Sequence, residues 1–375
     1  MATIIGHETA ARCWISGLFD EACIPAEYHG DTLMPGCDQV TPRSSLLAFD
    51  RICTDYQVAL RFGEGNEERR SDLPWYVGAN DSFKLTAARR DRLSRILGEI
   101  ASHDMHVLVP DESSRLRLAN AKVHMRGAPL PPGSLVRVMD GEDLFAVSPE
   151  LAFLQMASVL SLPKLAQLGC ELCSTYYYPP GAPNETGYRE LGLTSADMLK
   201  RFLGEYGYGH YIKRAQRAAE FVVDATRSPM ETTVALSLCL PIRLGGYGLP
   251  KPLVNYPVET FDSRKGRKAV RFVDLCWPNA HLAVEYNGQG FHTNEDDKTR
   301  DAFRQNDLVA EGWTVLAVTK DHYASMERFE SLAVQIAARI GYRLRRERLK
   351  PFRERRRLVS LLMEGNSLSS LSASR

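Results

Sequence analysis

The chain has 375 residues, of which 44% are hydrophobic and 25% charged, and its formal net charge at pH 7 is +1. This composition is typical of soluble globular proteins and excludes general disorder. There is neither an amino-terminal leader pattern nor an apolar run near the roughly 20 residues of a membrane span, so we expect a cytoplasmic protein without membrane contact. The length suits two or three domains.

The first 176 residues are expected to form a mixed α+β domain. Apolar side chains recur at helical spacing in residues 4–19 and 84–102. Short strand-like runs follow at residues 105–110, 121–125, 134–139 and 144–147. Ser148 as N-cap and Pro149 at the first helical position then predict the start of another helix.

The cysteines and histidines of this region carry no predicted site. Cys170 and Cys173 form a CxxC pair, but no second pair lies near enough in the sequence to complete a tetrahedral zinc site. The histidines are dispersed along the chain, and a structural role is expected for each. They are His7, His29, His103, His106 and His124.

Residues 5–14 and residues 144–161 carry a resemblance to a known family. They resemble the abortive-infection type IV antitoxins, in which a helical start precedes a domain whose V-S-P-E segment opens a helix. The resemblance implies a protein that regulates transcription of its own operon or takes part in phage defence. It also implies a toxin or another defence-system protein as partner.

Residues 177–190 are rich in Pro, Gly and Asn and are expected to link this domain to a second one at residues 191–345. Helices are predicted at residues 195–207, 210–226, 228–241, 298–312 and 326–341, and strands at residues 272–277, 282–288 and 313–319. From residue 226 the order is therefore α-β-β-α-β-α. Such an order predicts an α+β or α/β fold with a compact sheet flanked by helices.

The first two of these strands each carry one carboxylate at the centre, Asp274 and Glu285. An antiparallel hairpin folded at residues 278–281 places them opposite each other on one face, with Cβ atoms about 4.5–5.5 Å apart, and Asn287 on the same face. Two like charges there are destabilising unless a cation such as Mg²⁺ lies between them. The pair therefore predicts a metal site suited to phosphodiester hydrolysis. The alternative is that one carboxylate is exposed or ion-paired with a cation nearby in the sequence: Arg267, Lys268 or Arg271.

Three segments carry a second resemblance: residues 272–288, 291–292 and 298–319. Together they resemble the endonuclease-like domains related to the very-short-patch mismatch repair endonuclease, within the PD-(D/E)XK nuclease superfamily. The resemblance covers roughly residues 226–325 and implies a restriction-endonuclease-like fold that acts on nucleic acid, with DNA expected. It implies that Asp274 and Glu285 bind Mg²⁺ or Mn²⁺, with the carbonyl of Tyr286 as a further ligand.

Three other positions bear on catalysis. Glu231 lies three residues after Ser228, the spacing of a capping box, and the resemblance also implies a Glu on this helix that completes the acidic cluster; both interpretations stay open. Asn287 stands where the superfamily expects a Lys that would stabilise the transition state, which puts hydrolysis in doubt. His292 resembles a His that acts in acid–base chemistry, although a loop His can simply be exposed.

Basic residues on two segments are predicted to contact phosphates, with solvated helix faces as the alternative. On the helix at residues 298–312, the stripe of Ala302, Asn306 and Val309 is expected to face the sheet. Nine of the fifteen residues at 343–357 are Lys or Arg, and residues 346–375 are expected to form a basic helical tail with its arginines outward. The predicted nucleic-acid contacts are Lys298, Arg300, Arg304, Arg345, Arg346 and Arg348.

The leading hypothesis is a Mg²⁺-dependent endonuclease of a phage-defence, toxin–antitoxin or repair system. The alternative is a non-catalytic, antitoxin-like transcriptional regulator that binds nucleic acid through a degenerate nuclease fold. Asp274, Glu285 and His292 favour the enzyme, and Asn287 favours the regulator.

Overall fold

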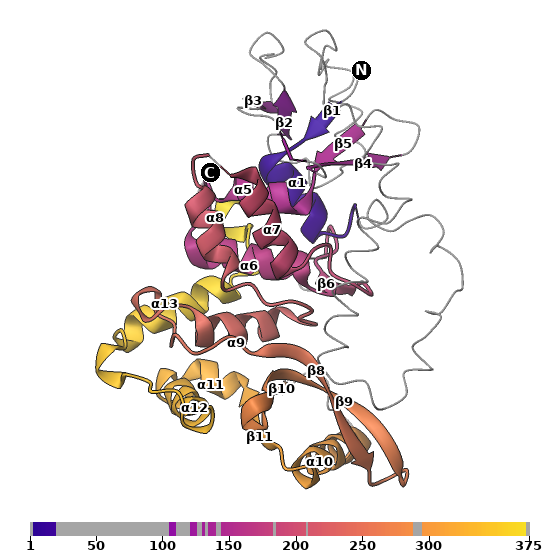
Figure 1. Cartoon of the computed structure of the whole chain (residues 1–375), viewed down its shortest axis with the longest axis vertical. Coiled ribbons are helices and arrows are strands. Elements are labelled where there is room, and N and C mark those ends of the chain that lie inside the picture. Colours follow the sequence, from indigo (N-terminus) through magenta and orange to yellow (C-terminus); the bar gives the residue numbers. More distant parts are fainter. Residues whose placement is uncertain are drawn as a thin grey trace. The chain divides into compact units, whose positions relative to one another are not determined.

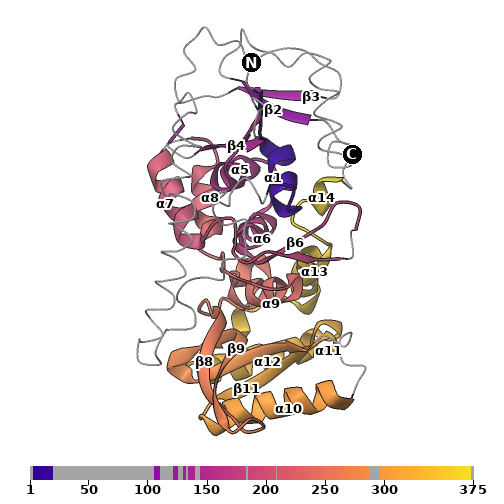
Figure 2. The same cartoon turned by 90° about the vertical axis from the view of Figure 1, so that its right-hand side faces the viewer.

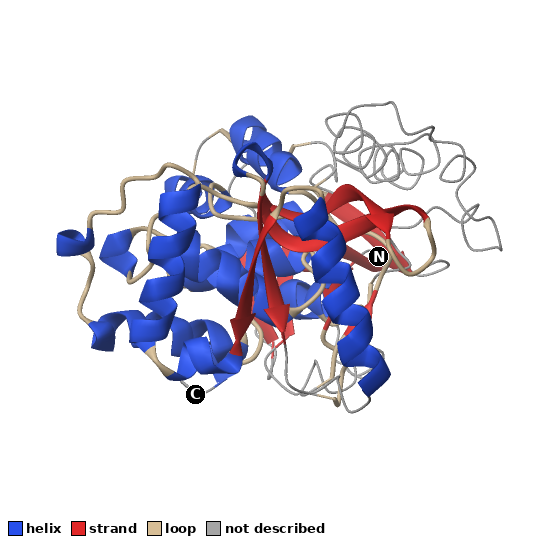
Figure 3. Cartoon of the chain, turned by 90° about the horizontal axis from the view of Figure 1, so that it is seen from below, coloured by secondary structure: helices blue, strands red, loops and turns tan. Residues whose placement is uncertain are grey.

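The structure is a computed structural model, and it describes residues 3–19, 105–109, 121–125, 130–131, 134–139, 144–182, 185–207, 209–287 and 295–372. The chain forms two compact units, unit 1 (Met1–Glu220) and unit 2 (Phe221–Arg375). Each contains helices and strands, so the fold is α+β (Figure 3). None of the described helices has the length and hydropathy needed to cross a bilayer. The helix expected at residues 84–102 lies outside the described residues.

Unit 1 contains a five-stranded sheet with the order β3-β2-β1-β5-β4 (Figure 1). Its strands are β1 (Thr3–Ile5), β2 (Met105–Val109), β3 (Ala121–Met125), β4 (Leu135–Met139) and β5 (Leu144–Val147). The central strand β1 pairs antiparallel with β2 and parallel with β5, while β2 and β3 are parallel. The four expected strands are confirmed. β1 occupies residues that were expected to be helical, and the helix begins only at His7.

The helices of unit 1 are α1 (His7–Ile15), α5 (Pro149–Met156), α6 (Leu162–Cys173), α7 (Ala196–Tyr206) and α8 (Ile212–Ala219). A two-stranded sheet pairs β6 (Tyr176–Tyr177) with β7 (Gly187–Tyr188). Ser148 caps α5 as predicted, because its hydroxyl accepts a hydrogen bond from the Leu151 N–H at 3.3 Å. Helices α7 and α8 pack on α5 and α6. The division between the units therefore falls after residue 220, whereas composition alone suggested a division near residue 190.

Unit 2 opens with α9 (Pro229–Cys239) and continues with a four-stranded sheet of order β11-β10-β9-β8. The strands are β8 (Leu253–Asp262), β9 (Arg267–Trp277), β10 (Leu282–Asn287) and β11 (Thr314–Thr319). The first three are antiparallel, and β11 runs parallel to β10. The remaining elements are η6 (Ile242–Leu244), η7 (Pro278–Ala280), α10 (Glu295–Ala310), α11 (Lys320–Ala324), α12 (Met326–Arg339), η8 (Arg346–Arg348), α13 (Phe352–Met363) and α14 (Ser369–Ser372).

Strand β8 was not predicted, although its sequence contains the signal. Tyr256, Val258, Thr260 and Asp262 are buried at every second position, which is the period of a strand with one face on a core. Pro257 lies within the run and has no N–H for a ladder, but β8 is an edge strand in the order β11-β10-β9-β8. An edge position tolerates a proline. The antiparallel part of the sheet thus has three strands where two were expected.

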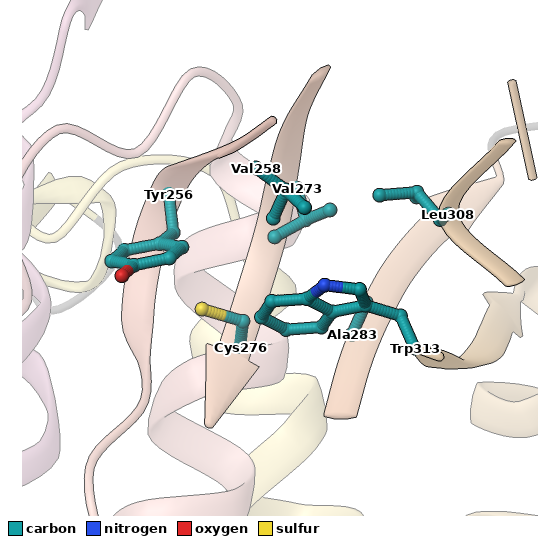
Figure 4. Packing of buried hydrophobic residues seen from close by; sticks show 7 residues of the cluster. All are labelled: Tyr256, Val258, Val273, Cys276, Ala283, Leu308 and Trp313. Carbon is teal, nitrogen blue, oxygen red and sulfur yellow. The ribbon is translucent and has the colours of Figure 1, made fainter. Parts of the chain in front are cut away.

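The core of this sheet is closed by α10 and by the residue before β11 (Figure 4). Its members are Tyr256, Val258, Val273, Cys276, Ala283, Leu308 and Trp313. The expected sheet-facing stripe of α10 is wrong, because Ala302, Asn306 and Val309 are exposed while Asp307 and Leu308 are buried. The buried face includes Asp307 since its carboxylate accepts hydrogen bonds from Ser263 and from Arg271.

The carboxyl-terminal segment is part of unit 2 and not a detached tail. Helix α13 packs on α9 and α12 (Figure 2). Arg355 points inward, contrary to the expectation of outward arginines: its guanidinium donates to Glu330 at 2.8 Å and to the Tyr247 hydroxyl at 2.7 Å. The chain between α9 and β8 turns sharply at Gly246, where a Cβ atom would lie 2.0 Å from the Leu240 carbonyl oxygen. Any larger residue there would displace the backbone.

Candidate metal-binding carboxylate site

The hairpin of β9 and β10 has the predicted register. Leu282 pairs with Trp277, Ala283 with Cys276 and Val284 with Leu275. Glu285 and Asp274 are the next residues of the two strands after the last of these pairs, and the alternation of a strand assigns both to one face.

The pairing of β9 with β10 ends at this point, among the residues that the structure describes. Strand β10 continues beside β11 as far as Asn287, which pairs with Thr319, and β9 continues beside β8. The sheet therefore forks where the two carboxylates lie. We call the place between the diverging strands the fork, defined by Asp274 of β9 and Glu285 of β10.

Asp274 is held by the backbone of the opposite strand. Its Oδ2 accepts a hydrogen bond from the Tyr286 N–H at 2.8 Å, in place of a ladder carbonyl. Burial raises the pKa of Asp274, and this hydrogen bond opposes that effect, followed by the positive charge of Arg304. A carboxylate with a raised pKa is one whose negative charge is incompletely compensated by the protein.

Glu231 combines the two interpretations left open by the sequence. The capping box is present, because the Ser228 hydroxyl accepts from the Glu231 N–H at 3.2 Å while the Glu231 carboxylate accepts from Ser228 and from the Arg227 N–H. The negative charge of Asp274 also acts on the Glu231 carboxylate. Burial, followed by the negative charge of Asp274, raises the pKa of Glu231 to about 7. The cap is thus also the third acid near the fork.

Glu285 is buried, with 7% of its surface exposed, and it forms an ion pair with Arg304 of α10. The Arg304 Nη2 lies 4.0 Å from the Glu285 Oε1 and also donates to the Phe272 carbonyl of β9. The cations that the sequence suggested as neutralising partners lie elsewhere. Arg271 binds Asp262 and Asp307 at 3.1 Å and 2.8 Å, while Arg267 and Lys268 are exposed.

The three acids do not form a closed cage in this structure. Within the described residues, ligand atoms of three or more His, Cys, Asp or Glu side chains lie within 4.8 Å of one another only at His7, His106 and His124 of unit 1. The carboxylates at the fork suit a hard cation that keeps several water ligands, since Mg²⁺ is usually held by one or two carboxylates. A dehydrated site with four protein ligands is not indicated there.

The other predicted site residues divide into described and undescribed ones. Asn287 is half-buried at the end of β10, two residues after Glu285. Tyr286 supplies its N–H to Asp274, and it is the neighbour of Val318 in the parallel pairing with β11. His292 lies outside the described residues, and so do the side chains of Lys298 and Arg300. Arg304 is the predicted basic residue that the structure places beside a carboxylate of the fork.

The predicted basic cluster near residue 346 is partly used within the protein. Arg345, Arg346 and Arg348 are exposed, but Arg346 donates to Glu330 at 2.8 Å and 3.1 Å. A guanidinium held in this way has fewer donors for phosphate oxygens.

A second basic cluster was not singled out by the sequence analysis. Arg264 and Lys265 lie in the turn between β8 and β9, Arg267 and Lys268 begin β9, and all four are exposed. The signal was present as the run RKGRK, which could be assigned to a hairpin tip only after β8 had been recognised. Comparison with protein-family models, curated proteins and solved structures finds no match for the chain.

Proposed function

We propose that unit 2 is a metal-dependent nuclease that hydrolyses phosphodiester bonds of nucleic acid, with DNA as the expected substrate. The observation that carries the proposal is the pair of opposed acids at the fork, Asp274 and Glu285, with Glu231 beside them and two of the three pKa values raised. Burying like charges together is costly unless a cation compensates them. If no cation bound at the fork, apolar residues in place of these acids would make the folded protein more stable.

Asp274 and Glu285 would hold Mg²⁺ or Mn²⁺, and the Tyr286 carbonyl would be a further ligand. When bound, such a cation activates a water molecule and neutralises the charge that develops on the phosphoryl oxygens. The oxygen-only donor set fits a hard divalent ion. Glu231, with a pKa raised to about 7, is suited to accept a proton from that water near neutral pH.

Arg304 supports the proposal by supplying the cation that Asn287 lacks. A nuclease needs positive charge near the transition state, and Asn287 is neutral. The Arg304 guanidinium lies 4.0 Å from Glu285 and is 39% exposed, so one side of it faces solvent, from which a phosphate can approach. A guanidinium can bind phosphate oxygens through two N–H groups.

The hairpin of β8 and β9 offers a surface for the substrate backbone. Its exposed tip carries Arg264, Lys265, Arg267 and Lys268, and such clusters bind phosphates without sequence preference. Phe272 is 39% exposed, two residues before Asp274 on the same face of β9. An exposed aromatic ring on this path is able to stack on an unpaired base.

The second candidate is a regulator that binds nucleic acid without cutting it, in keeping with the resemblance of unit 1 to antitoxins. The neutral side chain of Asn287 favours it, and in this candidate Arg304 serves only to compensate the charge of Glu285. A phage-defence, toxin–antitoxin or repair setting is part of the nuclease proposal, and a toxin or another defence-system protein is the proposed partner. The two candidates differ in whether the fork binds a metal ion and whether that metal supports cleavage.

The decisive experiment measures Mg²⁺ and Mn²⁺ binding by calorimetry and cleavage of plasmid and single-stranded DNA. Asp274→Asn keeps an oxygen that accepts from the Tyr286 N–H while removing the charge, so the fold should persist. We expect metal affinity and cleavage each to fall at least about 100-fold. Asp321→Asn is the matched control, since Asp321 is exposed and pairs only with the exposed Arg328 at 3.5 Å.

Arg304→Gln separates the two candidates further. For a nuclease it should retain metal binding and lose cleavage. Metal binding by the wild type without cleavage of either DNA would favour the regulator. Absence of metal binding by the wild type would overturn the proposal.

A further inference from the structure

Three histidines of unit 1 that are far apart in the sequence meet at one end of its sheet. His7 is the first residue of α1, directly after the central strand β1. His106 lies on β2 and His124 on the edge strand β3. In the parallel pairing of these strands His106 stands beside Lys122, so His124 follows two residues later on the same face.

The three imidazoles form one compact cluster. The His124 Nε2 lies 3.0 Å from the His106 Nδ1. The rings of His7 and His124 are stacked, with centroids 3.6 Å apart and planes inclined by 19°. One ring nitrogen from each of the three residues lies within 4.8 Å of the other two. The described part of the chain contains no other such group of three or more.

The backbone at His7 is unusual and points to a constraint at this position. Its φ is +49°, a left-handed value that costs about 1 kcal/mol or more for a residue with a side chain. The His7 N–H donates to the Gln155 side chain at 2.7 Å, and the preceding Gly6 N–H donates to the His106 carbonyl at 3.0 Å. Two independent hydrogen bonds therefore hold the turn that carries the His7 ring against His106.

The surroundings disfavour the charged form of His7 and of His124. Burial, followed by the neighbouring His124 and His106, lowers the pKa of His7 to about 3, and burial followed by Lys122 lowers that of His124. Glu8, the acid next to His7, forms an ion pair with Arg12 at 2.8 Å. Neutral imidazole is the form that binds metals.

We propose that His7, His106 and His124 form a binding site for one divalent transition-metal ion, with Zn²⁺ as the expected ion and a water molecule in its fourth position. An all-imidazole donor set selects Zn²⁺ over Mg²⁺, which prefers oxygen. Zn–N bonds of about 2.0–2.1 Å bring tetrahedral nitrogens to roughly 3.4 Å from one another. The 3.0 Å pair is already near that spacing, and ring rotation at the half-buried His7 and His124 closes the remainder.

The ion would join α1 and two strands of the sheet into one piece. His7 and His106 are separated by about a hundred residues, and a bond that closes so long a segment offsets a large loop entropy. The site is independent of the fork in unit 2, since the two sites share neither residues nor preferred ion.

The test is a titration of the chelator-treated full chain with Zn²⁺, followed by calorimetry and by elemental analysis of the metal retained after dialysis. We expect one equivalent of Zn²⁺ per chain for the wild type. His124→Ala and His7→Ala should each weaken binding at least about 100-fold. His210→Ala, an exposed histidine of unit 1, and Asp274→Asn, at the fork, should bind Zn²⁺ as the wild type does.

Several results would overturn this inference. One is the absence of Zn²⁺ binding by the wild type. Another is binding that survives both His7→Ala and His124→Ala, which would place the ion on thiols or carboxylates; Cys170→Ser checks the buried CxxC pair. Circular dichroism of each variant in chelator shows whether it is folded. His124→Gln, which keeps a polar side chain at the half-buried edge position, replaces His124→Ala if that variant unfolds.

Discussion

At the scale of single residues, Glu231 is subject to two opposing effects: its carboxylate caps α9, and it is buried close to the negative charge of Asp274. Its carboxylate accepts hydrogen bonds from Ser228 and from the Arg227 N–H, which stabilise the start of α9. Burial and the charge of Asp274 nevertheless raise its pKa to about 7. The folded protein therefore holds a proton on Glu231 at pH values where the unfolded chain has released it. Ionisation of Glu231 opposes folding.

The sign of the resulting pH dependence follows directly. Between about pH 4.5 and 7 the folded state binds more protons at Glu231 than the unfolded state does, so stability falls as pH rises through this range. In the presence of chelator, the free energy of unfolding of the wild type should fall by on the order of 2 kcal/mol between pH 5 and pH 8 because of Glu231. Glu231→Gln should not show this fall. Urea unfolding at the two pH values measures it, and an unchanged slope in Glu231→Gln would contradict the assignment.

The same measurement with Mg²⁺ tests the fork. A cation bound by the ionised acids should raise stability more at pH 8 than at pH 6, because protons compete with it at the lower pH. Asp197→Asn, a first-turn acid of α7 in unit 1, is the control and should leave both effects in place.

At the scale of elements, α13 is fixed to unit 2 by a buried cation. Arg355 is 4% exposed and donates to the Lys350 carbonyl, the Tyr247 hydroxyl and Glu330. Burial opposes the ionisation of Glu330, but the guanidinium groups of Arg346 and Arg355 outweigh it and hold its pKa below the usual range. The helix therefore docks through an ion pair at its first turns and through Leu358, Val359 and Leu362 beyond them.

Removal of the Glu330 charge should destabilise unit 2. Glu330→Gln leaves the Arg355 charge buried without its partner, and we expect it to lower the free energy of unfolding of unit 2 by about 3 kcal/mol. Glu311→Gln, at an exposed position directly after α10, is the control and should change stability by less than about 0.5 kcal/mol. Chemical denaturation at neutral pH gives both values. Equal effects of the two substitutions would show that the ion pair contributes nothing.

At the scale of the whole molecule, the chain has two separate hydrophobic cores. Unit 1 is built around a five-stranded sheet and unit 2 around a four-stranded sheet, and contacts cluster within residues 1–220 and 221–375. Phe153 of α5 and Phe329 of α12 are both fully buried, one in each unit. They provide a matched pair of core positions with the same side chain.

We expect two thermal transitions in calorimetry, one for each unit. A substitution of Phe153 identifies the transition of unit 1, and a substitution of Phe329 identifies that of unit 2. Phe153→Ala and Phe329→Ala should each destabilise their own unit by about 3–5 kcal/mol and leave the midpoint of the other transition in place. Zn²⁺ should raise only the transition that Phe153→Ala lowers, and Mg²⁺ only the one that Phe329→Ala lowers. A single transition that moves with either substitution would show that the units unfold together.

Local rules explain why much of the fork was predictable from the sequence. The facing positions of Asp274 and Glu285 depend on a short turn and on the two-residue period of a strand, which act over about a dozen residues. The cap of α9 depends on the spacing of Ser228 and Glu231 alone. These features need no knowledge of distant segments; the cap and the register of the hairpin up to Val284 and Leu275 are as the sequence predicted.

Tertiary structure decided the features that depend on distant partners. The inward face of α10 was assigned wrongly because Asp307 is neutralised by Arg271, some 36 residues away. Arg355 was expected outside because its partners, Tyr247 and Glu330, lie on other elements.

The histidine cluster unites residues from the start of α1, β2 and β3. Sequence alone determined which residue types and local elements this protein has. Only the tertiary structure decided which charges and imidazoles meet, since the free energy of burying a polar group is set by the partner that the fold brings to it.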